Sequence, residues 1–194
     1  PQDILDQLRL ATQEAHDYIE TVPLLQALRE QKIDLLSYIG LLQKLFAFYH
    51  FLEKSLDSQI PAQAGVEDYA ERMKHRLLRD DLVFLMGKLP ASLPKVDLSL
   101  VLDTPAKFLG YLYVIEGSTL GGQLLSKSIK NHLYLEAGRG GSYYNSYGSK
   151  QIGYYWKKLK AYLMAYAEQH PAQTTELLNS ARLTFQNLDQ HLRR

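Results

Sequence analysis

The sequence predicts an all-α protein, a single compact helical domain over residues 1–194. Three observations predict this fold class. Apolar residues recur three and four positions apart over long stretches, proline and N-cap residues stand where such stretches begin, and no segment alternates strand formers with a period of two. Neither an internal repeat nor a linker divides the chain, which is long enough to bury a substantial core.

The first half of the chain contains four periodic segments. Helices are expected over Asp3–Glu20, briefly after Pro23, over Asp34–Ser58 and over Glu67–Met86. An apolar stripe along one side of a helix is typical of a side that faces a core. In the third segment this stripe consists of Leu35, Ile39, Leu42, Phe46, Tyr49 and Leu52.

The second half begins with a long helix, expected over Pro105–Leu133. Thr104 is a favourable N-cap, and the proline after it suits the first helical position. Pro171 separates two further helices, expected over Ser149–Gln169 and Gln173–Leu192. The residues of the last helix expected to face inward are Leu177, Leu178, Ala181, Phe185, Leu188 and Leu192.

Composition excludes several classes of protein. Hydrophobic residues make up 46% and charged residues 22% of the chain, which is typical of soluble globular proteins. The formal net charge of +1 gives no reason to expect nucleic acid or an acidic membrane as a partner. The absence of cysteine excludes disulfides, Fe–S clusters and cysteine-ligated zinc. With no long apolar span and no signal-like N-terminus, a cytoplasmic protein is expected.

Three glycines interrupt the apolar run of the long helix. Gly117, Gly121 and Gly122 lie within six residues, and each costs about 1 kcal/mol relative to alanine in a helix interior. Gly117 and Gly121 share one face of the helix, and Ser118 and Gly122 share the adjacent face. The stripe without side chains either lets a flat molecule lie on the main chain or lets another helix pack closely. Spacing alone favours close packing.

One face of the first helix carries a histidine among polar residues. Arg9, Thr12, His16 and Glu20 are spaced by three or four positions. Glu20 can accept a hydrogen bond from one ring nitrogen of His16, which leaves the other nitrogen for a metal. Arg9 can pair with a carboxylate at the edge of whatever His16 binds. The alternative is a surface helix whose histidine only titrates.

Other features point less clearly to function. His50 is expected to be a hydrogen-bonded residue in or near the core, and His191 to lie in the tail. His75 belongs to the basic stretch 72–76, which is expected to be a solvated face. Residues 138–148 form a loop rich in glycine and tyrosine.

Together these residues resemble the bacterial branch of the heme oxygenases. The resemblance rests on two paired motifs in order, one around His16 and the Glu-Gly-Ser-Thr-Leu-Gly-Gly run over 116–122, and it extends over nearly the whole chain. The residues that carry it are Leu8, Arg9, Ala11, Thr12, His16, 116–122, Tyr147, Gly148, Gly153, Trp156, Lys157, Ala181 and Phe185.

The resemblance implies a fold in which heme lies between a proximal and a distal helix. His16 would bind the iron, with Glu20 as its hydrogen-bond partner. The kinked distal helix would carry the catalytic residues Gly117, Ser118, Gly121 and Gly122. The other expected heme contacts are Arg9 and Lys157 at the propionates, Tyr113 as a neighbour and Phe185 in the pocket wall. Mammalian-type enzymes have an aspartate at the position of Ser118, so proton delivery must be arranged differently here.

The implied reaction uses heme b as both cofactor and substrate. O₂ and electrons convert it to biliverdin, carbon monoxide and ferrous iron. The electrons come from an external donor such as ferredoxin with its reductase, because the chain has no G-x-G-x-x-G nucleotide motif. A basic surface around residues 72–79 or 157–160 could dock an acidic donor. A protein that accepts biliverdin is a further possible partner.

Three alternatives stay open. The first is a heme carrier or sensor of the same fold that does not cleave heme. The second is a di-iron enzyme, although no Glu-x-x-His pair or His-Glu-x-x-His motif occurs. The third is a thiamin-degrading or quinone-cofactor enzyme on a related helical fold, which leaves the face with His16 unexplained.

Overall fold

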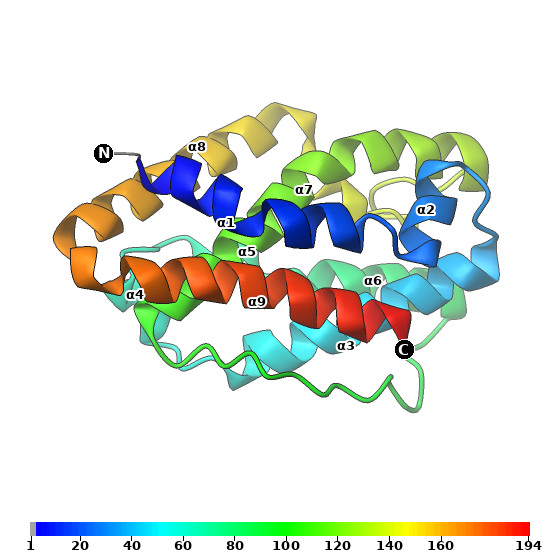
Figure 1. The fold of residues 1–194 in the computed structure, drawn as a ribbon. Coiled ribbons are helices and arrows are strands. Elements are labelled where there is room, and N and C mark those ends of the chain that lie inside the picture. The colour runs from blue at the N-terminus through cyan, green and yellow to red at the C-terminus, as the bar shows by residue number, and fades with distance from the viewer. Residues whose placement is uncertain (1–2) are drawn as a thin grey trace.

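The computed structural model describes residues 3–194, and no β-strand forms within them. Helices account for most of this part of the chain (Figure 1). They are α1 (Ile4–Ile19), α2 (Pro23–Arg29), α3 (Leu35–Ser55), α4 (Ile60–Gln63), α5 (Tyr69–Arg72), α6 (His75–Met86), α7 (Pro105–Leu133), η1 (Tyr143–Asn145), α8 (Gly148–Gln169), η2 (Pro171–Gln173) and α9 (Thr174–Arg193). The predicted all-α fold is confirmed, and the short helix α4 was not anticipated.

Side-chain caps fix the N-termini of α1, α3 and α7. Asp3 accepts a hydrogen bond from the Asp6 N–H at 2.9 Å, and Asp34 accepts one from the Ser37 N–H at 2.7 Å. Thr104 does the same for α7, with Pro105 at the first helical position as the sequence predicted. Each cap satisfies a backbone donor that has no partner inside the helix.

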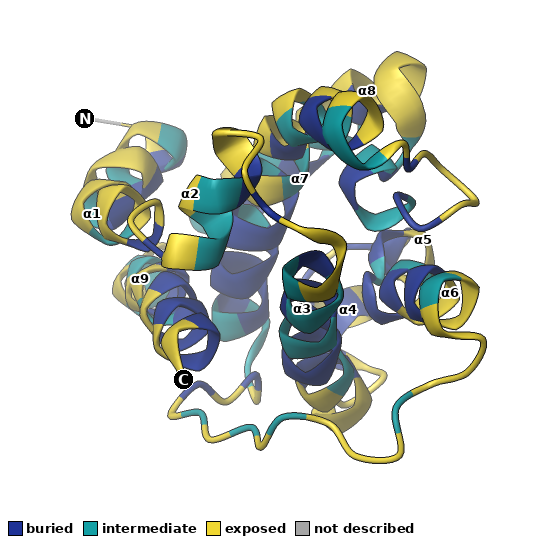
Figure 2. Ribbon diagram, turned by 90° about the vertical axis from the view of Figure 1, so that its right-hand side faces the viewer, coloured by how far each residue is buried: buried dark blue, intermediate teal, exposed yellow. Residues whose placement is uncertain are grey.

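The core lies where α7 crosses the centre of the molecule. α9 packs against both α7 and α1, and α3 packs against α6. Figure 2 shows buried turns of α7 between α9 and α3, while α1 and α2 lie at the surface. This arrangement brings α1 and α7, the two helices with the predicted functional residues, into one part of the fold.

One helix among residues 3–194, α3, is apolar enough in length and composition to cross a membrane, with a hydropathy of 1.3. Half of its apolar window is nevertheless buried inside the molecule. Leu41, Leu42, Phe48 and Tyr49 have no exposed surface. Within this fold α3 is a core helix.

The predicted helix Glu67–Met86 is interrupted, and the basic stretch inside it is not a solvated face. Met73 has extended backbone (φ −61°, ψ 129°) between α5 and α6. Arg72 and Lys74 are each only 1% exposed, and His75 is also buried. The Glu53 carboxylate accepts hydrogen bonds from the backbone N–H groups of Lys74 and His75 at 2.8 and 3.0 Å. These bonds satisfy the first amides of α6 and hold the break in place.

Two other histidines also differ from expectation. His191 is buried rather than in an open tail, and its Nε2 lies 2.8 Å from the Lys44 carbonyl oxygen. His50 lies at the core boundary as predicted, but its buried Nδ1 has no hydrogen-bond partner. Burial lowers the pKa of both imidazoles. Both are therefore neutral structural residues at pH 7.

Candidate functional site

A cleft of about 870 Å³ opens between α1 and α7. Its volume is in the range of sites that bind cofactors and other small molecules. Nearly all of the predicted site residues line it. They are Arg9, His16 and Glu20 from α1, Tyr113, Gly117, Ser118, Gly121 and Gly122 from α7, and Phe185 from α9.

Lys157 is the predicted site residue that the structure does not bring to the cleft. Its side chain is exposed on α8, whereas the preceding residue, Trp156, lines the cleft. Successive residues of a helix point about 100° apart. The turn of α8 that presents Trp156 to the cleft therefore directs Lys157 elsewhere.

His16 stands on the α1 wall with about half of its side chain exposed. Its ring meets the Phe185 ring edge-on, with centroids 5.6 Å apart. The Nε2 atom lies 3.9 Å from Glu20 Oε1, which is too long for the predicted hydrogen bond. Glu20 instead forms an ion pair with Arg29, with 3.1 Å between Oε2 and Nη1. The predicted neighbours are thus adjacent, but the carboxylate is directed to an arginine.

Gly117, Gly121 and Gly122 of α7 lie against open space or ordinary contacts. A β-carbon at Gly121 would meet nothing within 4 Å, and one at Gly117 would lie 3.8 Å from Trp156. At Gly122 the nearest atom would be Tyr144 Cδ1, at 3.6 Å. None of these positions requires glycine for contact with a neighbouring helix. The close-packing interpretation therefore fails for this stripe.

Gly110, earlier in the same helix, shows what close packing requires. A β-carbon there would collide with the Leu177 carbonyl oxygen and lie 2.7 Å from the Ala181 nitrogen and 2.8 Å from Ser180 Cβ. All three atoms belong to α9, and two are backbone atoms that cannot move independently. The sequence analysis did not single out Gly110, because an isolated glycine in an apolar run gives no sign of its neighbour.

The segment of α7 from Gly117 to Gly122, called the distal segment, offers few polar side chains. Ser118 is exposed on the cleft wall, and Thr119 donates its hydroxyl proton to the Ile115 carbonyl oxygen at 2.8 Å. No histidine, acid or arginine occurs between Gly117 and Gly122. Hydrogen bonding keeps α7 helical through this segment, although Figure 1 shows the helix changing direction partway along. Glycine and a hydroxyl that bonds back to the helix are common where helices bend.

Tyrosines close the inner end of the cleft. Tyr49 from α3 and Tyr143 from η1 both line it, with 2.9 Å between their hydroxyl oxygens, and Tyr144 lies beside them. Burial raises the pKa of the Tyr143 and Tyr144 hydroxyls well above the usual value, so both remain protonated. The Asp81 carboxylate holds η1 in place by accepting the N–H groups of Ser142 and Tyr143 at 2.8 Å each. The loop noted for its composition is thus part of the cleft wall.

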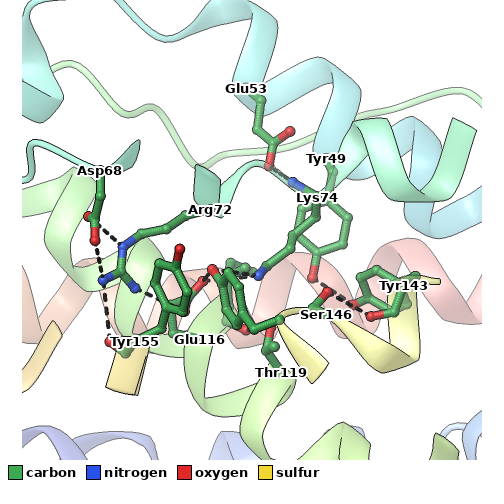
Figure 3. Close-up of polar contacts among 12 residues, drawn as sticks. Tyr49, Glu53, Asp68, Arg72, Lys74, Glu116, Thr119, Tyr143, Ser146 and Tyr155 are labelled. Carbon is green, nitrogen blue, oxygen red and sulfur yellow. Dashed lines mark hydrogen bonds and ion pairs between the residues drawn. The ribbon is translucent and has the colours of Figure 1, made fainter. Parts of the chain in front are cut away.

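A buried ionic cluster surrounds Glu116, the residue of α7 that precedes Gly117 (Figure 3). This Glu116 cluster consists of Asp68, Arg72, Lys74, Glu116 and Tyr147. Arg72 Nη1 lies 3.0 Å and Lys74 Nζ 3.1 Å from the Glu116 carboxylate, which also accepts the Tyr147 hydroxyl proton at 2.8 Å. Arg72 Nε lies 2.8 Å from Asp68. Burial lowers the pKa of Lys74, and the Glu116 charge opposes that shift. The cluster fixes the residue immediately before Gly117.

Three cations line the cleft, and the sequence analysis found only one of them. Arg9 was predicted, whereas Arg29 from α2 and Lys127 from α7 were not. Lys127 follows Gly117 by ten residues, which at about 100° per residue turns it roughly 80° away from Gly117, so extending the glycine stripe by helical periodicity would have missed it. Arg29 gave no sequence signal either, because its position depends on how α2 packs against the rest of the fold.

Three solved structures of similar fold are heme oxygenases of bacteria. The enzyme from Leptospira interrogans matches with a TM-score of 0.82 and 18% identity, covering 99% of both chains. Heme oxygenase-1 from the cyanobacterium Synechocystis, in complex with heme, matches with a TM-score of 0.75 and 20% identity over 98% of this chain and 91% of that one. The NO- and CO-bound enzyme of Neisseria meningitidis gives 0.77 and 22% identity, over 100% and 92%.

The sequence itself matches a family model over almost its full length. No curated protein matches significantly. The model described as heme oxygenase, however, covers residues 2–194, which include both helices that border the cleft. The chain therefore belongs to the heme oxygenase family.

Proposed function

We propose that the cleft binds heme between α1 and α7 and that the protein cleaves it with O₂ to biliverdin, carbon monoxide and ferrous iron. One observation carries the proposal. The glycine stripe of α7 meets no packing partner at Gly121 and faces the cleft that His16 lines from α1. A flat macrocycle fits between bare main chain and an imidazole.

The residues of the cleft suit the chemistry of heme. Apolar side chains make up much of its wall, including Leu45, Val114 and Phe185, and the cations Arg9, Arg29 and Lys127 suit the two propionates. His16 is the residue placed to bind iron. No group of three or more His, Asp or Glu side chains suited to a metal gathers within residues 3–194, so a di-iron site has no support.

When bound, heme supplies the iron that activates O₂ and is itself the molecule oxidised. The chain's part is to bind, orient and shield. The absence of side chains at Gly117 and Gly121 would let the backbone of α7 approach one face of the ring. Ser118 offers a hydroxyl there, in place of the aspartate of mammalian-type enzymes, and no side chain between 117 and 122 can act as a strong acid or base. The protonated Tyr49–Tyr143 pair closes the inner end and can donate a hydrogen bond.

The orientation of the macrocycle depends on the cations. Because Arg9, Arg29 and Lys127 line the cleft, they would hold the propionates of a bound heme and so fix how the ring is turned within the cleft. Lys157 is not needed for this role in the proposed arrangement. Lys127 replaces it.

We further propose that electrons come from a separate redox protein such as ferredoxin with its reductase. Arg72 and Lys74 cannot dock it, because both are buried. Arg9 and Lys127 are exposed where they line the cleft, which makes them the better candidates for an acidic donor. A cytoplasmic location and a single functional unit over residues 1–194 complete the proposal.

The test is to reconstitute the protein anaerobically with heme and then add ferredoxin, its reductase and air. Cleavage would replace the Soret band by biliverdin absorbance, and carbon monoxide would form. A stable oxygen complex without biliverdin would instead identify a carrier. His16→Ala should abolish the normal ferric spectrum, with His170→Ala, exposed at the end of α8, as the matched control. An unchanged spectrum in His16→Ala would remove this histidine from the site.

A further inference from the structure

We propose that Arg29 is a positioning residue that holds the Glu20 carboxylate away from His16 and so limits how strongly this histidine donates electrons to the heme iron. The inference rests on the proposed function in taking His16 as the iron ligand. It adds a residue of α2 that the motifs around His16 and Gly117 do not contain.

Arg29 contacts Glu20 twice. Its Nη1 lies 3.1 Å from Glu20 Oε2, and its Nη2 donates to the Glu20 backbone carbonyl. Glu20 is the C-cap residue of α1, and Arg29 is the last residue of α2. The arginine therefore binds both the side chain and the main chain at the end of the helix that carries His16. Because Arg29 is also held by the Glu20 backbone carbonyl, it restricts the Glu20 carboxylate more than a single surface ion pair would.

The carboxylate is consequently shared unequally between two neighbours. Glu20 Oε2 is within hydrogen-bond distance of Arg29, whereas Oε1 lies 3.9 Å from His16 Nε2. The other acid beside the imidazole, Asp17, lies 3.5 Å from Nδ1 and also accepts from Gln13 at 3.0 Å. The imidazole thus has two carboxylates near it, and each is engaged by another side chain.

A carboxylate bonded to a metal-bound histidine raises the basicity of the ligand, and this tunes the metal. A more basic axial ligand stabilises ferric over ferrous heme, so the reduction potential falls. Arg29 both neutralises the Glu20 charge and restrains its position, so it opposes this effect. This effect comes from the negative charge near the imidazole ring, whichever ring nitrogen binds the iron.

A purely structural role would have a different signature. Arg29 and Glu20 have side chains that are 38% and 50% exposed, and ion pairs of this kind contribute little to stability. Loss of Arg29 should therefore leave the melting temperature of the heme-free protein nearly unchanged. The reduction potential and the iron–histidine stretching frequency should change instead.

The experiment measures the midpoint potential and the ferrous iron–histidine stretch of heme-bound Arg29→Gln, with Arg29→Lys as the conservative variant. We expect Arg29→Gln to shift the potential to more negative values and the stretch to higher frequency, and Arg29→Lys to restore much of both. In a Glu20→Gln background, Arg29→Gln should leave the iron–histidine stretch unchanged, because the carboxylate that it frees is absent.

Lys32→Gln is the matched control, since Lys32 also forms an exposed ion pair with a carboxylate, that of Glu30, but does not line the cleft. It should leave the iron–histidine stretch unchanged with either residue at position 20. An unchanged stretch in Arg29→Gln, or an equal change with and without the Glu20 carboxylate, would overturn the inference and leave Arg29 as a propionate contact only. Failure of the wild type to bind heme would overturn the proposed function as well.

Discussion

The two halves of α7 contain glycine for opposite reasons. From Pro105 to Glu116 most residues are buried, and Gly110 leaves room for the backbone of α9. From Gly117 to Lys127 only Gly122 is buried, and a β-carbon added at Gly121 would meet nothing within 4 Å. In the first half the missing side chain is replaced by another helix. In the second half it is replaced by the cleft.

The difference shows which glycines the fold itself requires. Three glycines in a helix interior cost about 3 kcal/mol relative to alanine. At Gly110 such a cost is offset by the packing of α7 on α9, whereas the distal glycines gain no comparable contact. Their cost therefore has to be explained by what the cleft binds. The Glu116 cluster lies at the boundary between the halves and fixes the point where one ends and the other begins.

The largest expected effect concerns that boundary. Glu116→Gln removes the negative charge shared by Arg72 and Lys74, both of which are buried. Breaking one partner of a buried ion pair costs about 3–5 kcal/mol, because the buried Lys74 loses its carboxylate partner. We expect the melting temperature to fall by roughly 6–20 °C. Calorimetry measures the melting temperature of Glu116→Gln and, as a control, that of Glu14→Gln at an exposed position. Equal melting temperatures for the two variants would show that the Glu116 cluster does not stabilise the fold.

The next largest effect on stability concerns the first half of α7, Pro105–Glu116, which packs against α9. Gly110→Ala places a β-carbon against the Leu177 carbonyl oxygen and 2.7 Å from the Ala181 nitrogen. Overpacking of this kind costs about 1–3 kcal/mol, since α9 must shift as a whole. Urea unfolding should show the loss of stability. A stability equal to or above that of the wild type would mean that α7 and α9 are not in close contact at this position.

Much of the fold could be predicted from local patterns in the sequence. The cap at Thr104 and the period of the apolar residues predicted the long helices, because both signals depend on residues a few positions apart. The burial of Arg72 and Lys74 could not be predicted this way. Their partner Glu116 is more than forty residues away, and a local run of basic residues is typical of a surface.

The residues of the candidate site likewise divide into those with a local sequence signal and those without one. His16 and the glycines were identified from motifs within single helices, and the structure brings them to one cleft. Arg29 and Tyr49 also line this cleft, but α2 and α3 contribute them through packing that no local pattern records. Lys157 was assigned by resemblance alone, and the orientation of α8 directs it away from the cleft.

A third prediction tests the second half of α7, Gly117–Lys127, by placing a bulky side chain in the cleft that it borders. Gly121→Leu introduces a bulky side chain where the structure has no neighbour within 4 Å, so the heme-free protein should keep its helicity. If a macrocycle lies on this stripe, its affinity should fall by about tenfold or more, equivalent to about 1.4 kcal/mol. Heme titration followed at the Soret band measures the change, with Gln123→Leu, at a nearby position of α7 that does not line the cleft, as the control. Wild-type affinity in Gly121→Leu would separate the stripe from ligand binding.

The smallest effect is the one that contrasts most directly with Gly110. Gly121→Ala makes the same substitution in the same helix, but its new β-carbon meets nothing within 4 Å. Alanine is favoured over glycine in a helix interior by about 1 kcal/mol. We therefore expect Gly121→Ala to stabilise the heme-free protein by about 0.5–1 kcal/mol, the opposite sign to Gly110→Ala. Parallel urea titrations of the two variants measure both signs. If Gly121→Ala also destabilised the protein, the distal half of α7 would depend on backbone freedom at this glycine, and the distinction between the halves would have to be drawn from flexibility rather than from packing.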